Sequence, residues 1–182
     1  PQLAKENKKY IYGLIKHGSR AKDYEGALLW LENYGLIKRV SRVTKVNFPL
    51  QAYTDSKAFK LYIHDVGLLN AMGNVSEKIL LGPSRMFTEF KGSLTEQFVL
   101  QELVSNNVTP YYWSENTSEL DFLIEKESTI TGIEVKAEEN LKAKSLKVFN
   151  SKYPDANCIR LSLSSFRKEE WLTNIPLYAV TL

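Results

Sequence analysis

Two short runs of alternating apolar residues flank a polar turn between residues 119 and 136, in the stretch "ELDFLIEKESTITGIEVK". This alternation predicts two β-strands paired as a hairpin, because successive side chains of a strand point to opposite faces. One face is expected to carry the apolar side chains Leu120, Phe122, Ile124, Ile133, Val135 and Ala137. The other face is expected to carry the charged side chains Glu119, Asp121, Glu134 and Lys136. Because a slip of one residue exchanges the two faces, the pattern constrains which side chains can meet.

The register of this hairpin decides what Asp121 contacts. A four-residue loop at 126–129 places Asp121 opposite Glu134, whereas a shift by two residues places it opposite Lys136. Asp121 and Lys136 would form an ordinary cross-strand ion pair, worth about 0.2–1 kcal/mol. Asp121 and Glu134 would repel each other unless a cation, such as a divalent metal, lies between them. Lys136 would then neutralise charge on a phosphate oxygen or orient water. The hairpin alone favours the ion pair and leaves both registers open.

A helix predicted over residues 88 to about 106 has a carboxylate within its apolar arc. At about 100° per residue, Glu96 falls between Leu100 and Leu103. Burying an unpaired carboxylate costs several kcal/mol, so Glu96 is expected to have a partner such as a metal, Lys136 or a backbone donor. In the alternative, Glu96 lies at the margin of the helix and its tip reaches water.

The elements predicted after residue 65 follow the order helix, three strands, helix and strand. Their expected ranges are 88–106, 108–116, 118–126, 130–137, 140–154 and 157–166. Residues 77–86, which include a glycine and a proline, are expected to form a loop. This αβββαβ order predicts a mixed α/β (α+β) domain.

The first 64 residues predict two helices followed by two strands. The helices are expected over residues 3–18 and 23–35, with Asp23 as the N-cap of the second and Gly35 at its end. The strands are expected over residues 36–46 and 51–65, with a turn near Phe48-Pro49. Two helices followed by a basic ribbon are typical of a winged helix. The chain is therefore predicted to divide into a winged-helix domain, residues 1–64, and a second domain, residues 65–182.

The charges are distributed unevenly along the chain. Residues 1–61 hold 12 Lys and Arg against 5 Asp and Glu, a net charge of +7, whereas the remaining residues have a net charge of −4. The basic side chains on the predicted ribbon are those of Lys38, Arg39, Arg42 and Lys45. These side chains are predicted to contact DNA phosphates. A solvated basic face is the alternative, and winged helices also serve as protein-interaction modules.

Composition excludes several classes of protein. The chain is 43% hydrophobic and 25% charged, as globular proteins are. No apolar run approaches the roughly 20 residues that span a bilayer, and no signal peptide opens the chain, so no membrane association is expected. Cys158 is the only cysteine, which favours a reducing compartment, the cytoplasm. With only His17 and His64, a metal would be held mainly by carboxylates, which favours a hard ion.

The arrangement of the charged residues resembles that of the PD-(D/E)XK nuclease-like superfamily. In that superfamily a helix with a glutamate precedes a strand with an aspartate and a strand with Glu-X-Lys, here Glu96, Asp121 and residues 134–136. One departure is that Leu120, not proline, precedes Asp121. More narrowly, "KLYIHDVGLL", "GSLTEQFVLQEL", "YYWSENTSELDFLI" and "IEVKA" resemble the DUF4143 domain, the C-terminal region of bacterial and archaeal AAA-type ATPases. The similarity is expected to cover nearly the whole chain.

The resemblance implies a restriction-endonuclease-like core preceded by a winged helix. It implies that Asp121 and Glu134, helped by Glu96, hold Mg²⁺ or Mn²⁺, and that Lys136 assists the attack of water. It also implies an N-terminal ATPase domain as a partner. No G-x-x-x-x-G-K-[ST] motif occurs in the sequence, so no nucleotide site is assigned to these residues. Three functions follow as hypotheses: a metal-dependent DNA endonuclease, a non-catalytic DNA- or protein-binding module that serves the ATPase, and an interaction domain without nucleic acid.

Overall fold

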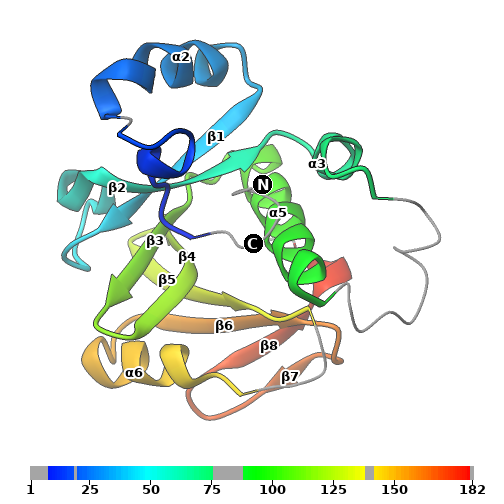
Figure 1. Ribbon diagram of the computed structural model, residues 1–182. Coiled ribbons are helices and arrows are strands. Elements are labelled where there is room, and N and C mark those ends of the chain that lie inside the picture. Colours follow the sequence, from blue (N-terminus) through cyan, green and yellow to red (C-terminus); the bar gives the residue numbers. More distant parts are fainter. Residues whose placement is uncertain (1–7, 19, 76–87, 138–141, 181–182) are drawn as a thin grey trace.

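The computed structural model of the chain describes residues 8–18, 20–75, 88–137 and 142–180 (Figure 1). The part before residue 76 contains short 3-10 turns, two helices and two strands. These elements are η1 (Tyr12–Leu14), α2 (Ala21–Asn33), β1 (Ile37–Val43), η2 (Leu50–Tyr53), β2 (Thr54–Ile63) and α3 (Val66–Met72).

The part after residue 87 contains two helices, six strands and a last 3-10 turn. These are α5 (Thr88–Ser105), β3 (Tyr111–Glu115), β4 (Ser118–Lys126), β5 (Thr129–Val135), α6 (Lys144–Lys152), β6 (Asn157–Ser162), β7 (Arg167–Lys168), β8 (Thr173–Pro176) and η4 (Leu177–Ala179). From α5 to β6 the order of elements is the predicted αβββαβ order. The loop predicted at 77–86 lies outside the described residues.

The eight strands of the described residues form one mixed sheet in the order β2-β1-β3-β4-β5-β6-β8-β7. β1 and β2 form an antiparallel ribbon, and β1 also pairs in parallel with β3. β3, β4 and β5 are antiparallel neighbours, whereas β6 and β8 continue in parallel to β5. The basic ribbon therefore lies in the same sheet as the central hairpin. These pairings confirm the mixed α/β class, while the winged helix stays a prediction.

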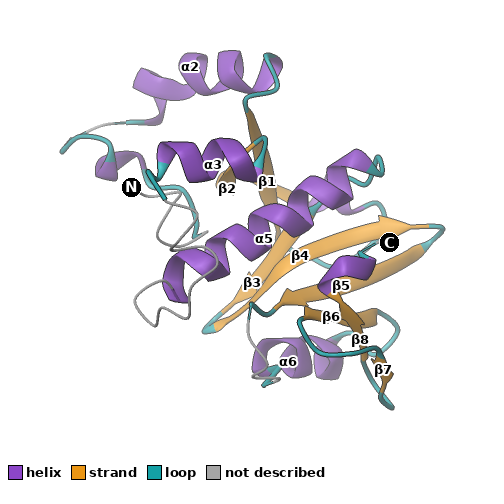
Figure 2. Cartoon of the chain, turned by 90° about the vertical axis from the view of Figure 1, so that its right-hand side faces the viewer, coloured by secondary structure: helices purple, strands orange, loops and turns teal. Residues whose placement is uncertain are grey.

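Helices cover both faces of the central strands (Figure 2). On one face, α5 inserts Leu103 into a buried cluster that contains Phe122. On the other face, α6 inserts Leu146 and Phe149 into a second cluster, which contains Leu120. The central β-strands are thus enclosed on both faces, and the polar side chains Thr131 and Glu134 of β5 are withdrawn from bulk water.

The helix predicted over residues 3–18 is wrong for residues 8–18, where the structure has only the single turn η1. The backbone N–H of Tyr10 donates a hydrogen bond of 2.8 Å to the Phe59 carbonyl of β2. The rings of Tyr10 and Phe59 are stacked at 5.7 Å, and the Tyr12 ring packs against both. Tertiary packing on β2 thus overrides the helical periodicity of this segment.

The helix predicted over 23–35 is confirmed, but Asp23 is not its N-cap. α2 begins two residues earlier, and the Asp23 carboxylate accepts a hydrogen bond of 3.0 Å from the Arg20 backbone N–H. Asp23 therefore occupies the third position of the helix, where a carboxylate satisfies the N–H of the capping residue. Gly35, with a φ of +70°, follows the end of α2 as predicted.

Gly132 lies where β5 passes α6 and β4 at close range. A β-carbon added there would lie 2.7 Å from Leu120 Cδ1 and 2.8 Å from Phe149 Cε1. We expect Gly132→Ala to lower the free energy of unfolding by about 1–3 kcal/mol, because the buried neighbours must move. Urea unfolding tests this, with Gly26→Ala in α2 as the control, where nothing lies within 4 Å of the added carbon. Equal stability of Gly132→Ala and the wild type would contradict the tight packing.

Candidate functional site

The register of the central hairpin brings Asp121 opposite Glu134. Residues 127–128 form a two-residue turn, and both have positive φ, as tight hairpin turns require. The ladder runs from this turn to the pair Phe122–Ile133. Asp121 and Glu134 are not themselves paired in the ladder, but the same register continued by one residue sets them opposite each other. It is the register predicted from the 126–129 loop, and not the one that pairs Asp121 with Lys136.

A bulge in β4 changes the faces of its side chains. Two pairs with β3 enclose the extra residue, Tyr111–Leu123 and Trp113–Leu120. As a result Leu120 packs in the α6 cluster, whereas Phe122 and Ile124 pack in the α5 cluster. The prediction that these three residues share a face is wrong, because a bulge resets the alternation of a strand. Asp121 lies within the bulge, between Leu120 and Phe122.

Asp121 and Glu134 form the two-carboxylate part of the site. Asp121 Oδ2 accepts a hydrogen bond of 2.7 Å from the Val135 backbone N–H. Glu134 is buried, and its Oε1 lies 2.8 Å from Lys136 Nζ. Burial raises the pKa of Glu134; Lys136 opposes this shift and Asp121 reinforces it. Glu134 Oε2 is buried and has no hydrogen-bond partner within the described residues.

A buried lysine from β2 lies on the other side of Asp121. Lys60 is 1% exposed, and its Nζ lies 2.7 Å from Glu119 Oε1. Burial would lower the pKa of Lys60, but the carboxylates of Glu96, Asp121 and Glu119 outweigh it and raise the pKa. The Lys60 ammonium therefore stays charged inside the protein, paired with Glu119 and within the negative field of Glu96 and Asp121.

Glu96 is half-buried on α5, and Tyr62 of β2 is one of its partners. The Tyr62 hydroxyl donates a hydrogen bond of 3.1 Å to Glu96 Oε2. Complete burial, followed by the charge of Glu96, raises the pKa of Tyr62 well above its ordinary value, so the hydroxyl stays a donor. Glu96 thus has a partner, as predicted, in the Tyr62 hydroxyl. Among the described residues, no three His, Cys, Asp or Glu side chains are grouped so that they could hold a metal ion.

A buried polar network adjoins Glu134 on β6 and β8. Arg160, the neighbour of Glu134 across the β5–β6 ladder, is 2% exposed. Its Nε donates to Asn174 Oδ1 at 2.9 Å, and the same oxygen accepts a hydrogen bond of 2.8 Å from the Ser162 hydroxyl. Nη2 of the same Arg160 guanidinium lies 3.3 Å from Glu169 Oε1. This network fixes Arg160 beside the buried carboxylate.

The four residues predicted to contact DNA differ in how available their charges are. Arg39 lies between Glu25 and Glu32 of α2, at 3.3 and 3.4 Å, and its guanidinium packs on a ring of the β2 strand at 4.3 Å. Arg42 forms an ion pair of 2.6 Å with Asp55. Lys38 is half-buried, and Lys45 is exposed. The two arginines are thus held by acidic partners, which leaves the two lysines as the better candidates for phosphate contacts.

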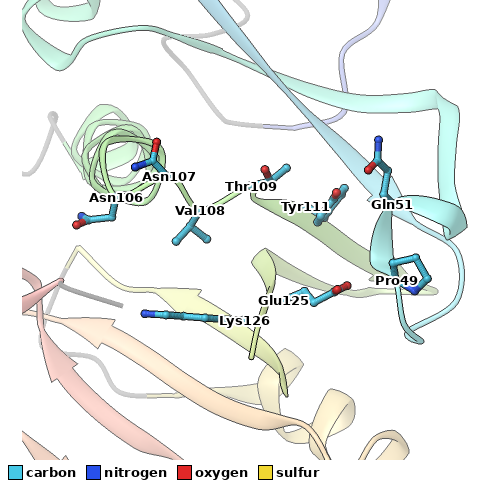
Figure 3. A pocket seen from close by; sticks show the side chains of 9 residues that line it. All are labelled: Pro49, Gln51, Asn106, Asn107, Val108, Thr109, Tyr111, Glu125 and Lys126. Atoms are coloured by element: carbon cyan, nitrogen blue, oxygen red, sulfur yellow. The ribbon is translucent and has the colours of Figure 1, made fainter. Parts of the chain in front are cut away.

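The described part of the chain also has a pocket of about 330 Å³ at the far end of the hairpin, near its turn (Figure 3). Its lining residues are Pro49, Gln51, Asn106, Asn107, Val108, Thr109, Tyr111, Glu125 and Lys126. Glu125 Oε2 is engaged there by the Leu50 backbone N–H at 2.7 Å. None of the predicted catalytic residues lines this pocket, so it is separate from the carboxylate cluster.

Sequence reasoning missed three members of the site: Lys60, Tyr62 and Arg160. A weak signal existed for Arg160, which is the one charged residue in the short, mostly apolar run "NCIRLSL". Lys60 and Tyr62 lie in "KAFKLYI", where Lys60 alternates with the apolar residues Phe59 and Leu61, as in an ordinary amphipathic strand. Their burial depends on the position of β2 above α5 and β4, which no local pattern reveals.

The fold and the cluster together define a mixed α/β protein with carboxylates from one helix and two strands gathered around two lysines. Residues 91–180 match the family model described as the domain of unknown function DUF4143, which confirms the predicted resemblance for this segment. Residues 2–79 match a different model, the domain of unknown function DUF8612. The resemblance to DUF4143 therefore covers less of the chain than predicted. No curated protein matches the chain. Within the described ranges, no helix has the length and apolar character needed to cross a membrane.

Proposed function

We propose that the segment 91–180 is a nuclease-like domain that cleaves DNA by metal-dependent phosphodiester hydrolysis. The observation that carries the proposal is the buried Glu134 Oε2 of β5, an acceptor without a hydrogen bond within the described residues, on the strand that neighbours the strand of Asp121. Buried acceptors are almost always satisfied in folded proteins, so an unsatisfied carboxylate oxygen points to an absent cation. This proposal includes the restriction-endonuclease-like nature of the αβββαβ core.

The donor chemistry of the site fits Mg²⁺ or Mn²⁺, since both prefer carboxylate oxygens. Asp121 and Glu134 would hold the ion, whereas Glu96 accepts a hydrogen bond from Tyr62 and supports the cluster from α5. When bound, the metal would activate a water molecule and neutralise charge on the scissile phosphate. A site with only two protein carboxylates leaves most coordination positions for water and phosphate oxygens.

The protein's own contribution to the reaction is positioning and charge. The hydrogen bond from the Val135 N–H holds the Asp121 carboxylate in the bulge. Lys136 is partly exposed, with 32% of its side chain accessible, so its ammonium reaches a bound phosphate while its partner Glu134 stays inside. That ammonium would stabilise the charge that develops on a phosphate oxygen as water attacks. Lys45, and to a lesser extent Lys38, would contact flanking phosphates.

A cleavage assay on purified protein tests the proposal. We expect cleavage of duplex, single-stranded or branched DNA with Mg²⁺ or Mn²⁺, and none with a chelator. Asp121→Asn should remove cleavage, because the amide loses the negative charge that a metal ligand needs here. Glu127→Gln, an exposed change in the turn of the same hairpin, is the matched control and should keep full activity. Wild-type protein that cuts none of these substrates with either metal would refute the proposal.

A second candidate is a non-catalytic DNA- or protein-binding module that regulates an attached AAA-type ATPase. The ion pair between Glu134 Oε1 and Lys136 favours it, because the pair neutralises the site without a metal. In this case DNA affinity would depend on salt but would not change with chelator or with Asp121→Asn. Fluorescence anisotropy of labelled DNA at several salt concentrations distinguishes the two candidates.

A further inference from the structure

Helix α6 has a basic outward face that the proposed hydrolysis does not use. Between residues 142 and 154 the sequence has four lysines and neither aspartate nor glutamate. Residues 62–182 as a whole are acidic, with 12 Lys and Arg against 16 Asp and Glu, a net charge of −4. The positive charge is therefore local to this helix and does not follow from the composition of the segment around it.

The periodicity of α6 directs its lysines away from the sheet. Leu146 and Phe149 are buried in the cluster beneath the helix, whereas Lys144 and Lys147 are exposed. At about 100° per residue, Lys144, Lys147 and Ser151 follow one another along the outward side of the helix. Within the described part of the chain, neither Lys144 nor Lys147 has an acidic partner. We call these three side chains the α6 lysine face.

The unpaired charge is concentrated in the first half of α6. Lys152, in the last turn, forms an ion pair with the carboxylate of Glu115. Its charge is therefore compensated within the protein. Lys144 and Lys147 precede it by two turns and by one turn of the helix, and they keep their charge for an outside partner.

The first turn of α6 lies at the end of the sheet that carries the carboxylates. α6 connects the parallel strands β5 and β6, so it returns in the opposite direction and starts near the end of β5, where Glu134 lies. The Ser145 hydroxyl accepts a hydrogen bond of 3.4 Å from the Glu119 backbone N–H, two residues before Asp121. The α6 lysine face thus begins beside the proposed site.

The chemistry of this face fits a polyanion better than a membrane surface. A helix that binds a membrane inserts its apolar face among the lipids. The apolar face of α6 is instead buried against the sheet, and Val148 is the one large apolar side chain of α6 that is exposed. Lysine ammonium and serine hydroxyl groups are the donors that contact the phosphates of nucleic acids.

We propose that the α6 lysine face binds the phosphate backbone of DNA and leads the strand to the carboxylate site. The choice of DNA as the polyanion rests on the proposed function. Each lysine that neutralises a phosphate releases a condensed counterion, so the contacts are visible in the salt dependence of binding. Binding through α6 requires neither metal nor cleavage and can therefore be measured apart from catalysis.

Fluorescence anisotropy of labelled DNA, with a chelator present and over a range of salt concentrations, tests the inference on the full chain. Combining Lys144→Gln with Lys147→Gln should make the slope of log K against log salt shallower by about 1.8 for duplex and about 1.4 for single-stranded DNA. Combining Lys144→Arg with Lys147→Arg should keep the wild-type slope. All four changes are on exposed side chains, where substitutions alter stability by less than about 0.5 kcal/mol.

Two controls separate local contacts from net charge. Lys152→Gln, in the same helix, should leave the slope unchanged because Glu115 already holds that lysine. Combining Lys126→Gln with Lys168→Gln removes two exposed charges of the same segment and should also leave it unchanged.

A wild-type slope in the double glutamine variant would overturn the inference, and so would an equal loss of slope in the Lys126 and Lys168 control. Wild-type protein that binds vesicles with anionic lipids but no DNA at low salt would also overturn it, since the face would then fit a membrane. Salt-dependent binding that requires Lys144 and Lys147, without cleavage under any metal, would support the inference and refute only the proposed hydrolysis.

Discussion

Glu134→Gln is expected to abolish DNA cleavage without weakening the fold at neutral pH. The loss should be at least about a hundredfold, since even residues that only support a metal ligand cost 10–100-fold. The stability should not fall, because the change removes a negative charge that is 6% exposed and has one oxygen without a hydrogen bond. Lys136 loses an ion-pair partner, but its side chain is 32% exposed and can be hydrated instead.

The effect of Glu134→Gln on stability should depend on pH in a defined direction. Burial raises the pKa of Glu134 above its ordinary value of 4.5. The native state thus favours the protonated acid. The stability that this preference contributes is complete below pH 4.5 and is lost as the pH rises through the raised pKa of Glu134. Glu134→Gln should therefore have the same free energy of unfolding as the wild type in acid. Above the raised pKa it should be at least as stable as the wild type.

Urea unfolding from acid to neutral pH measures this dependence, and a cleavage assay on the same samples measures the activity. Lys126→Met, an exposed change in the same β4–β5 hairpin, is a control that should alter neither quantity. A Glu134→Gln variant that is clearly less stable than the wild type at pH 7 would show that this carboxylate has a structural role.

Asn174→Ala is expected to cause the largest loss of stability among the changes considered, about 3–5 kcal/mol. The side chain is 1% exposed, and its oxygen accepts from Arg160 and Ser162. Its amide nitrogen donates to the carbonyls of Ser164 and Ser165, at 3.2 and 2.9 Å. Truncation removes all four hydrogen bonds and takes the acceptor away from the buried Arg160 Nε and the buried Ser162 hydroxyl, and an unsatisfied buried group costs about 1–3 kcal/mol.

Urea unfolding checks this expectation against Asn157→Ala, an exposed asparagine at the start of the adjacent strand β6. The control should change the free energy of unfolding by less than about 0.5 kcal/mol. A loss of less than about 1 kcal/mol in Asn174→Ala would mean that water or the Arg160 side chain replaces the missing hydrogen bonds.

The sequence allowed the central strands to be predicted because their signals are local. Period-two alternation and a short polar turn define β4 and β5, and the hairpin register follows from the turn length. The same reasoning failed for Leu120, because the bulge that moves it to the other face depends on the pairing of β4 with β3, which is not part of the hairpin. The prediction of the first helix was wrong for a similar reason. Tyr10 packs on Phe59, which is 49 positions further along the sequence, so no local pattern reveals the contact.

The predicted site shows the same division between local and distant information. Asp121, Glu134 and Lys136 could be predicted because one hairpin holds all three. Glu96 could be singled out because a charge among apolar helix positions is visible in the sequence. Lys60 could not be predicted, because its partners are contributed by elements that lie between 36 and 61 residues further along the chain.

The parallel pairing of β1 with β3 has a consequence for how proteins of this kind can recombine. The two matched segments, 2–79 and 91–180, share one sheet, and a lysine of the first is buried among carboxylates of the second. A relative that exchanged the first segment would need a new strand for the exposed edge of β3 and a new countercharge for Glu96, Asp121 and Glu119. The two segments are therefore not interchangeable modules, and each sets requirements on the sequence of the other.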